Sequence, residues 1–580
     1  MAIFKGLLGR LGWLVLFLVS PVLAQTPPDA GSLLRQQEQL QQRVPGQLPS
    51  REAEVTRPDL KVGTGETVRV IAIRFSGATE LVPETELQSL VADAIGRDLD
   101  FAGLQQLTQR VTSYLKSHGW FLARAYLPAQ DITSGTIEIA LIAGRLSQRE
   151  PVRITEGGKL ALRIDPERLA AIAERQLAAG EVAREDQLNR TVLLMNDLPG
   201  ISARARLEPG DDSGETRVIL TLDEGQLLSG SVSADNYGSR DTGTDQLNAS
   251  LDVNDPLGIG DKLSLAATGS EGTRLARLGY SLPLGSDGWK MNVGMTDLRY
   301  KVTTATGRAA GLEGDSQTVS AGLIYPWLRS RTANLYVSLT QSHKELVDRS
   351  TTGTLRDKRV DTSTLTLSGD RLDNIGGGGL SSFSLGLTGG TLGLELQADA
   401  AADATGYRTA GGYNKIGYTV GRLQKLPGAF NLFANLTGQQ AGKNLDSSEK
   451  LYLGGPAGVR AYPGSEAGSD SGQILNLELR YDWPEATLLG PLQLQAFYDS
   501  GWANLHHDTR NLPIATSTGR NNYRIAGAGI GFSVMKPGSH VIRASLASKV
   551  GSNPGRTVQG NDADGLADST RLWLQAILLF

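Results

Sequence analysis

The C-terminal part of the chain alternates apolar and polar residues with a period of two, and this pattern limits the possible folds more than any other feature. About sixteen such segments can be marked between residues 227 and 580. A period of two indicates β-strands with two chemically different faces. No window after residue 24 holds the ~18 consecutive apolar residues of a spanning helix. Such strands are typical of membrane β-barrels, whose hydrophobicity is hidden in the alternation.

Segment 474–483 shows the two faces most clearly. Its apolar face carries Leu475, Leu477, Leu479, Tyr481 and Trp483, and its polar face carries Asn476, Glu478, Arg480 and Asp482. We expect the first face to meet lipid, with its aromatic residues in an interfacial girdle, and the second to line a water-filled lumen. In a soluble sandwich, the alternative, the polar face would meet bulk water. The last segment, 571–580, ends the chain on Phe580, with Leu572, Leu574, Ala576, Leu578 and Phe580 on one face.

The connections between these segments alternate in length. Seven are short and rich in proline or glycine, near 256–258, 285–287, 329–333, 374–379, 427–428, 484–490 and 537–538. Most others are long and polar, at 343–359, 389–412, 438–472, 503–522 and 551–570, with a short exception at 269–272. Short turns at one end and long loops at the other are typical of outer-membrane barrels, and an even strand number puts both barrel ends on the periplasmic side.

The N-terminus has the pattern of an export signal. Residues 1–24 carry Lys5 and Arg10, then an apolar run at 11–19, then Val22-Leu23-Ala24 as a cleavage site. This predicts a signal peptide and a mature chain that begins at Gln25, because the apolar run is too short for the alternative, a membrane anchor.

A polar helix and a linker are expected next. Domain 25–44 contains a helical pattern at 29–44, capped by Asp29 and ended by Pro45-Gly46. The thin apolar face of this helix (Leu33, Leu34, Leu40 and Val44) suits water or a wet cavity rather than a core. Residues 45–66 have no period and read as a linker.

Residues 67–225 contain an internal repeat, which predicts two βααββ domains, 67–143 and 144–225. The first has strand patterns at 68–75, 122–127 and 136–142 and helical patterns at 83–95 and 101–117. The second has strands near 152, at 201–207 and at 216–222 and helices at 166–178 and 185–198. Ala123-Arg124-Ala125 recurs as Ala203-Arg204-Ala205, although chance similarity of two α+β modules is the alternative. The remaining domain, 226–580, is the predicted transmembrane barrel.

Composition and motifs argue against an enzyme. The chain has no cysteine, which excludes a thiol nucleophile and a thiolate metal site, and its charge of −4, about −6 without Lys5 and Arg10, argues against nucleic-acid binding. His506-His507 lacks further ligands at defined spacing and is expected to be exposed. Gly376–Gly379 is a turn, and Asp223-Glu224 is expected to be solvated surface. We therefore expect no catalytic residue, metal or cofactor.

One loop and one strand carry candidate functional residues. The glycine-rich stretch 454–463 presents Arg460 at the tip of the longest loop, and the alternation of segment 492–502 points Asp499 into the lumen. If the loop folds inward, the two can form a bidentate ion pair. In a wet lumen such a pair is worth about 1 kcal/mol, which would suit a latch that opens.

Together these features resemble the two-partner secretion transporters (TpsB type), the haemolysin-activator and filamentous-haemagglutinin-transporter family of the outer-membrane insertase superfamily. The βααββ units resemble its POTRA domains. The sixth-loop motif of the family is matched by Val459, Arg460, Ala461 and Tyr462, and its strand-13 motif by Phe497, Asp499 and Gly501. Ala461 stands where the family has glycine, so the loop tip could differ in shape.

The resemblance implies a function. It predicts type Vb secretion: an outer-membrane transporter that recognises an unfolded TpsA-type exoprotein, an adhesin or a cytolysin, in the periplasm and translocates it to the surface of a Gram-negative cell. It also implies contact with outer-membrane lipid and with the barrel assembly machinery through the strand that ends at Phe580. The N-terminal helix and the 438–472 loop are candidate plugs of the lumen. The alternatives are a barrel assembly factor of the same superfamily and a passive porin.

Overall fold

A computed structural model describes residues 28–41, 67–158, 161–212, 214–485, 487–510 and 512–580. The expected signal peptide, the linker, Val44 and Pro45-Gly46 lie outside these residues. None of the helices in the described residues is both long and apolar enough to cross a bilayer.

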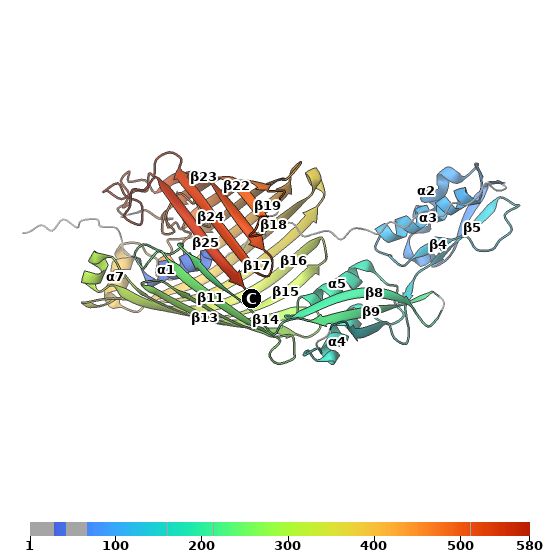
Figure 1. Ribbon diagram of the computed structural model, residues 1–580, viewed down its shortest axis with the longest axis horizontal. Coiled ribbons are helices and arrows are strands. Elements are labelled where there is room, and N and C mark those ends of the chain that lie inside the picture. Colours follow the sequence, from blue (N-terminus) through green and yellow to red (C-terminus); the bar gives the residue numbers. More distant parts are fainter. Residues whose placement is uncertain (1–27, 42–66, 159–160, 213, 486, 511) are drawn as a thin grey trace, which may run out of the picture.

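The larger body is a closed β-barrel of sixteen antiparallel strands, as predicted, in which each strand pairs with the next and β25 pairs with β10 (Figure 1). The strands are β10 (Leu228–Asp235), β11 (Gln246–Asn254), β12 (Lys262–Gly269), β13 (Thr273–Leu284), β14 (Trp289–Lys301), β15 (Glu313–Arg329), β16 (Ala333–Ser350), β17 (Gly353–Asp373), β18 (Gly379–Leu394), β19 (Gly411–Lys425), β20 (Phe430–Ala441), β21 (Ser471–Asp482), β22 (Leu492–Asn504), β23 (Asn522–Lys536), β24 (His540–Lys549) and β25 (Thr570–Leu579).

Burial alternates along the strands as the period of two requires. On β21, Leu479 and the following Trp483 are exposed on the outer face, whereas Asn476 and Glu478 are buried inside the barrel. An apolar outer wall and a polar inner wall are what lipid outside and water inside select.

The seven predicted turns all lie at one end of the barrel, called the turn end below. The opposite, loop end carries the 442–470 loop with the short helix η4 (Ser447–Glu449), and the loop 395–410 with α7 (Gln397–Thr405). The 302–312 loop at that end contains α6 (Ala305–Ala310). Gly376 to Gly378 form a turn with positive φ, as expected of a glycine run.

The prediction of a long loop at 343–359 is wrong. Strands β16 and β17 continue to Ser350 and from Gly353, so a two-residue turn joins them and a second short connection, besides 270–272, lies at the loop end. These strand ends carry polar residues on both faces, for example His343 outside and Lys344 inside. The alternation therefore fades although the strand pairing continues.

The first βααββ unit contains β1 (Val68–Arg69), β2 (Ala72–Gly77), η1 (Thr79–Leu81), α2 (Glu84–Val91), η2 (Ala92–Ala94), β3 (Asp98–Leu99), α3 (Phe101–Ser117), β4 (Arg124–Tyr126) and β5 (Thr136–Ile142). The single strand predicted at 68–75 is split, because β1 pairs with the added β3 while β2 pairs in parallel with β5. The helices cover one face of the β2-β5-β4 sheet around buried residues such as Leu87, Val111 and Ile139.

The second unit repeats the order with β6 (Arg145–Leu146), β7 (Val152–Glu156), α4 (Pro166–Gln176), α5 (Glu185–Asn196), β8 (Ile201–Pro209) and β9 (Glu215–Glu224). It lies against the turn end of the barrel, and the first unit extends away from it (Figure 1). The expectation that Glu224 is solvated is wrong, since its side chain is 0% exposed and binds Arg163 at 2.5 Å.

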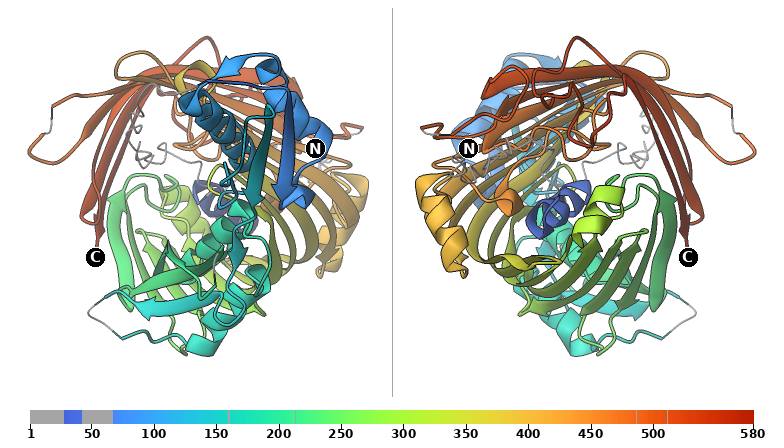
Figure 2. Two further views of the ribbon diagram at one scale, coloured as in Figure 1. Left: turned by 90° about the vertical axis from the view of Figure 1, so that its right-hand side faces the viewer. Right: turned by 90° about the vertical axis from the view of Figure 1, so that its left-hand side faces the viewer.

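Helix α1 (Ala30–Leu40) lies inside the barrel, near its loop end (Figures 1 and 2). Asp29 caps it as predicted, accepting a hydrogen bond from Ser32 N at 2.8 Å. The helix ends at Leu40 and not at residue 44. The expectation that this helix lies in water or in a wet cavity fits its side chains that line the lumen cavity. It does not fit the first turns, because Ala30, Leu33 and Leu34 are buried against apolar residues of the barrel wall, among them Leu298 and Leu346.

Candidate functional site

The 442–470 loop folds into the barrel and binds its inner wall through Arg460. The Arg460 guanidinium donates from Nε and Nη2 to the Asp499 carboxylate, both at 2.8 Å, and from Nη1 to Glu478 Oε1 at 2.8 Å. The guanidinium carbon lies 3.4 Å from the centre of the Phe497 ring. The loop therefore holds a cation between two carboxylates and an aromatic face, an arrangement that suits arginine and not lysine.

Further bonds fix the main chain of the loop around this cation. Arg460 N donates to Asp499 Oδ2 at 3.1 Å, and Arg460 O accepts from Trp573 Nε1 at 2.7 Å. Asn476 Nδ2 donates to Gly458 O at 2.9 Å and to Asp499 Oδ1 at 2.8 Å. Strands β21, β22 and β25 thus all contact the same loop tip.

Small residues on the wall make room for the tip. A Cβ on Gly501 would lie 3.1 Å from Val459 Cγ2, and a Cβ on Gly527 would lie 2.5 Å from the Ala461 methyl. Ala461 is not among the residues with positive φ, and both it and Tyr462 are 0% exposed. The methyl that distinguishes Ala461 from the glycine of the resembling family is accommodated because β23 has glycine opposite it.

Burial makes removal of one partner of this anchor more costly than it would be in a wet lumen. Asp499 is 0% exposed and Arg460 is 6% exposed, so the pair does not lie in a wet lumen. Removing one partner of a buried ion pair costs about 3–5 kcal/mol, because the remaining charge stays buried and unpaired.

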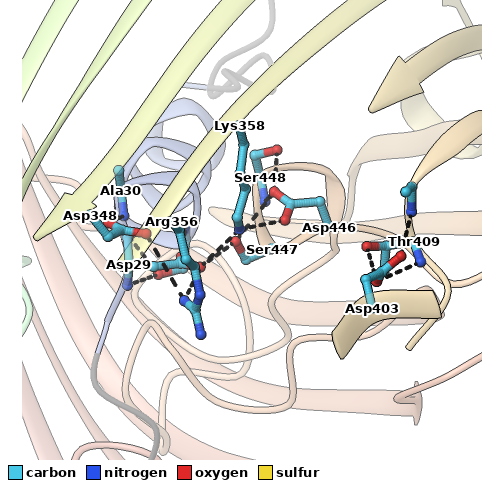
Figure 3. Close-up of polar contacts among 12 residues, drawn as sticks. Asp29, Ala30, Asp348, Arg356, Lys358, Asp403, Thr409, Asp446, Ser447 and Ser448 are labelled. Carbon is cyan, nitrogen blue, oxygen red and sulfur yellow. Dashed lines mark hydrogen bonds and ion pairs between the residues drawn. The ribbon is translucent and has the colours of Figure 1, made fainter. Parts of the chain in front are cut away.

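Helix α1 is bound to both the barrel wall and the 442–470 loop through Asp29 (Figure 3). The Asp29 carboxylate accepts from Arg356 at 3.1 Å and from Ser447 Oγ at 2.7 Å, and lies 3.6 Å from Lys358 Nζ. Ala30 N donates to Asp348 Oδ1 at 2.9 Å. The start of the helix is therefore held by wall strands β16 and β17 on one side and by the loop on the other.

Two wall lysines are shared between the helix and the loop. Lys358 Nζ donates to Asp446 of the loop at 2.6 Å in addition to its contact with Asp29. Lys344 Nζ lies 3.3 Å from Glu38 of α1 and 3.2 Å from Glu449 of the loop. Each lysine thus keeps a carboxylate partner in the loop whether or not the helix is present.

The charge at the start of α1 is stabilised by these cations. Burial raises the pKa of the Asp29 carboxyl, but Lys358 and Arg356 outweigh this effect and lower the pKa to about 2. The bound helix therefore carries Asp29 as an anion at neutral pH.

The long loops are also bound to one another. Within the 395–410 loop, Asp403 at the end of α7 accepts hydrogen bonds from Thr409 N and Oγ1 at 2.9 and 2.7 Å, which fix the conformation of this loop (Figure 3). Arg408 Nη2 lies 3.0 Å from Asp508, and Asn444 Nδ2 donates to Asp508 O at 2.9 Å. The 395–410, 442–470 and 505–521 loops thus form a connected cover over the loop end.

A cavity of about 1010 Å³ remains in the lumen. It is bounded by α1, by the tip of the 442–470 loop and by the inner faces of the barrel strands. Its walls are mostly hydroxyl, amide and glycine residues, which is consistent with a water-filled space.

A model of the family described as "Haemolysin secretion/activation protein ShlB/FhaC/HecB" matches residues 214–534, and a model of the "POTRA domain, ShlB-type" matches residues 68–144. The chain belongs to this haemolysin secretion/activation family. It is a two-partner secretion transporter of the outer membrane, and its POTRA domains lie in the periplasm. The turn end of the barrel is thus periplasmic and the loop end extracellular.

Two transporters of known name are similar to this chain over most of its length. The heme/hemopexin transporter protein HuxB of Haemophilus influenzae is 26% identical over 571 residues, covering 96% of each chain. The outer membrane transporter CdiB of Escherichia coli O6:K15:H31 (strain 536) is 26% identical and covers 87% of this chain and 85% of its own. These names describe transporters, which supports a role other than catalysis.

Solved structures share the fold. The structure of CdiB from Escherichia coli has a TM-score of 0.68 at 21% identity and covers 94% of this transporter and 95% of its own chain. The structure of CdiB from Acinetobacter baumannii has a TM-score of 0.63 at 18% identity, with 94% and 96% covered.

Sequence reasoning located Arg460 and Asp499, which the structure brings together, but it missed their third partner. Glu478 could have been found, because the alternation already placed it on the lumen face. The shared lysines Lys344 and Lys358 were missed because they fell in the wrongly predicted loop 343–359.

The histidine pair differs partly from expectation. His507 is exposed, but His506 is half-buried with its ring 5.2 Å from that of Tyr407, and burial lowers its pKa to about 4. Among the described residues no group of three or more His, Cys, Asp or Glu side chains is placed to hold a metal ion.

Proposed function

We propose that this transporter recognises an unfolded TpsA-type exoprotein in the periplasm and passes it through the barrel to the cell surface. The observation that carries the proposal is the content of the lumen. Helix α1, joined along the chain to the rest of the protein only through residues 42–66, lies in the lumen near the loop end of a barrel whose inner wall is polar. A lumen that holds its own removable occupant fits a conduit that opens on demand.

The POTRA domains supply a means of recognition. In the first domain the sheet order β2-β5-β4 leaves β2 and β4 at its edges, and in the second β7 pairs only with β9. An exposed edge strand can bind an extended chain through main-chain hydrogen bonds, which need little sequence specificity. An unfolded exoprotein offers such a chain.

The shared lysines support release of the helix. When α1 leaves, Lys344 and Lys358 keep Glu449 and Asp446 as partners, so departure leaves no cation buried without a counter-charge. Asp29 and Glu38 leave with the helix and are solvated by water. The main cost of unpaired buried charge is thereby avoided.

Deletion of residues 25–50 tests the plug. We expect the purified variant to show higher conductance in planar bilayers than the full chain, because the helix no longer occupies the cavity. A barrel with unchanged conductance would count against α1 as the resting plug. Arg510→Ala changes an exposed arginine of an extracellular loop and leaves the helix in the lumen. As the control, it is expected to conduct like the unsubstituted chain.

Substitution of Arg460 or Asp499 tests the role of the 442–470 loop in transport. We expect Arg460→Ala and Asp499→Ala to reduce secretion of the exoprotein while the barrel still reaches the outer membrane, because the 442–470 loop loses its fixed position. Full secretion by both variants would remove the loop from the mechanism.

The remaining expected partners also belong to this proposal. The exposed apolar belt fits outer-membrane lipid, and β25 with the terminal Phe580 fits recognition by the barrel assembly machinery. The filled lumen counts against a passive porin.

A further inference from the structure

The lumen has two chemically different walls, and only one of them faces the open cavity. Strands β21–β25 carry charged groups that the loops already bind, such as Asp499 with Arg460 and Lys549 with Asp562 at 2.5 Å. Strands β14–β20 continue the barrel wall from β20, which pairs with β21, to the side opposite β21–β25 (Figures 1 and 2). The tip of the 442–470 loop therefore covers the charged wall. Strands β14–β20 are covered near the loop end by α1 and by residues 445–449, and elsewhere they face the cavity.

Serine and threonine make up most of the cavity lining on strands β14–β20. Fourteen of the residues that line the cavity on β14–β20 are serine or threonine, and Lys344 and Lys415 are the only charged ones among them. Both lysines lie at the extracellular end and are paired with Glu449 at 3.2 and 2.7 Å. The middle of this wall is uncharged.

The hydroxyl groups form a continuous surface across neighbouring strands. Thr364 on β17 is the register partner of Thr340 on β16 and of Thr388 on β18, and Thr419 on β19 is the partner of Thr437 on β20. The outward residues of the same strands, such as Leu365 and Leu387, are apolar and exposed. The hydroxyl pattern is thus confined to the lumen face.

Two polar oxygen atoms on this wall are buried without a hydrogen-bond partner in the ranges that the structure describes. Asn435 is 7% exposed, and its Oδ1 atom has no hydrogen-bond partner among the described residues although its amide donates to Thr437. Thr318 Oγ1 likewise lacks a partner within the described part of the chain. Both residues belong to the cavity lining, although these two oxygen atoms are themselves buried.

An uncharged hydroxyl surface suits the passage of an extended polypeptide chain. A hydroxyl can donate and accept, so it can exchange hydrogen bonds with successive N–H and C=O groups of an extended chain. It offers no fixed charge, and a charged side chain of the passenger therefore finds no partner that would hold it in place. Ion pairs inside a narrow lumen would be stronger than in bulk water and would slow passage.

We propose that strands β14–β20 form the surface along which the transported polypeptide slides, and that this surface tolerates passengers of either charge while the Arg460 tip of the 442–470 loop stays bound to β21–β25. This inference rests on the proposed transport function. It adds the route through the lumen and the class of passenger, an extended chain with little restriction on its charge.

Current block in planar bilayers tests the route. The probes are three unstructured peptides of about 30 residues, long enough to span a bilayer when extended. One contains only serine, glycine and asparagine, and the other two carry several lysines or several glutamates. Applied from the periplasmic side of the full chain, they are expected to block the current with residence times that agree within about threefold.

Two lysine substitutions distinguish the walls. Thr366→Lys places a charge in the middle of the hydroxyl wall, and Gln495→Lys places one on the lumen face of β22. We expect the glutamate peptide to reside about tenfold longer in Thr366→Lys and to change less than about twofold in Gln495→Lys. Thr366→Ser keeps the hydroxyl and is expected to behave as the unsubstituted chain.

Other outcomes overturn the proposal. Equal effects of the two lysine substitutions would place the route elsewhere, and a more than tenfold difference between the charged peptides in the unsubstituted chain would refute charge tolerance. Either result leaves the transport function standing. If no peptide blocks the current in any variant, including the variant without residues 25–50, the transport function fails and this inference fails with it.

Discussion

At the residue scale, the side chain of Arg460 combines charge and geometry. Its three donor atoms reach two carboxylates, and its flat face stacks on Phe497. A lysine would keep the charge, but its single ammonium group cannot match the fork of the Asp499 carboxylate.

Arg460→Lys is therefore expected to loosen the 442–470 loop without preventing barrel assembly. The loss of two charge-assisted hydrogen bonds should cost about 2–4 kcal/mol of loop stability. Limited proteolysis in detergent measures the loop stability, and the variant is expected to be cleaved faster within the loop. Arg510→Lys, at an exposed position, serves as the control. Cleavage at the original rate would show that charge alone holds the loop.

Glu466 in the same loop is buried and binds without a cation. Its carboxylate accepts from Asn553 Nδ2 and from Ala563 N, both at 2.8 Å. Burial raises the pKa of Glu466 to about 7, and the nearby Asp562 carboxylate acts in the same direction. The folded loop thus favours the protonated acid, and its stability falls as pH rises from about 4.5 to about 7.

Glu466→Gln should remove this penalty. At pH 8 the variant is expected to be more stable than the unsubstituted chain by roughly 2–3 kcal/mol, and at pH 4 the two should agree. Protease resistance of the loop at the two pH values is the measurement, with the half-exposed Glu395→Gln as control. A gain of the same size at both pH values would contradict the assignment.

At the element scale, α1 is held by charges that acid can remove. The pKa of Asp29 is about 2 in the bound helix, below its ordinary value of 3.8, because Lys358 and Arg356 outweigh the effect of burial. A lowered carboxyl pKa stabilises the bound helix above about pH 4, and this stabilisation is lost as pH falls toward 2.

Bilayer conductance should therefore rise when the pH is lowered from 5 to 2.5. The shift of nearly two pKa units corresponds to about 2 kcal/mol, enough to change the bound fraction severalfold. Asp29→Asn should conduct more at pH 7 and respond less to acid. If the substituted and unsubstituted chains respond alike, another group controls the helix.

The elements predicted well from the sequence are those whose two faces each keep the same surroundings, lipid or lumen, along the whole element. Within the bilayer, lipid and lumen select opposite side chains, so strands such as β21 and β22 show the period of two. Beyond the bilayer the outer face of β16 and β17 meets water, and the inner face carries lysines that bind α1 and the 442–470 loop. Both faces are therefore polar, and the period of two disappears at His343 and Lys344 although main-chain pairing continues. Helix α1 was detected from its capping and composition, but its burial depends on the distant residues Leu298 and Leu346, which local pattern does not show.

At the scale of the whole molecule, the second POTRA domain is docked on the periplasmic turns. Arg329 of β15 donates from Nε and Nη2 to the carboxylate of Asp197 at 2.9 and 2.7 Å, and Lys290 Nζ donates to Asp197 O at 2.6 Å. Arg190 of α5 donates to Asp287 O at 3.1 Å. The end of α5 is thereby fixed against two barrel turns.

The joint between the two POTRA domains has a different chemistry. The pair Arg145–Glu80, at 3.2 Å, is about half exposed on each side, whereas the side chains of Arg329 and Asp197 are 15% and 22% exposed. Exposed pairs contribute little to stability, and less exposed bidentate pairs contribute more. The charged contacts therefore restrain the second domain on the barrel more than they restrain the first domain on the second.

Asp197→Asn is accordingly expected to widen the range of positions of the second domain. The absence of cysteine from the chain allows spin labels at only two introduced sites, Glu174→Cys on α4 and Ile375→Cys on the β17–β18 turn. The distance distribution between the labels should be narrow in the otherwise unsubstituted chain and broader in Asp197→Asn. Glu80→Gln, which breaks the exposed pair, should leave the distance distribution unchanged.

A passenger held on the edge strand β7 must enter the lumen beside these turns, so a broadened distribution should be accompanied by slower secretion. If the distribution broadens and secretion is unaffected, a fixed angle between this domain and the barrel is not needed for transfer.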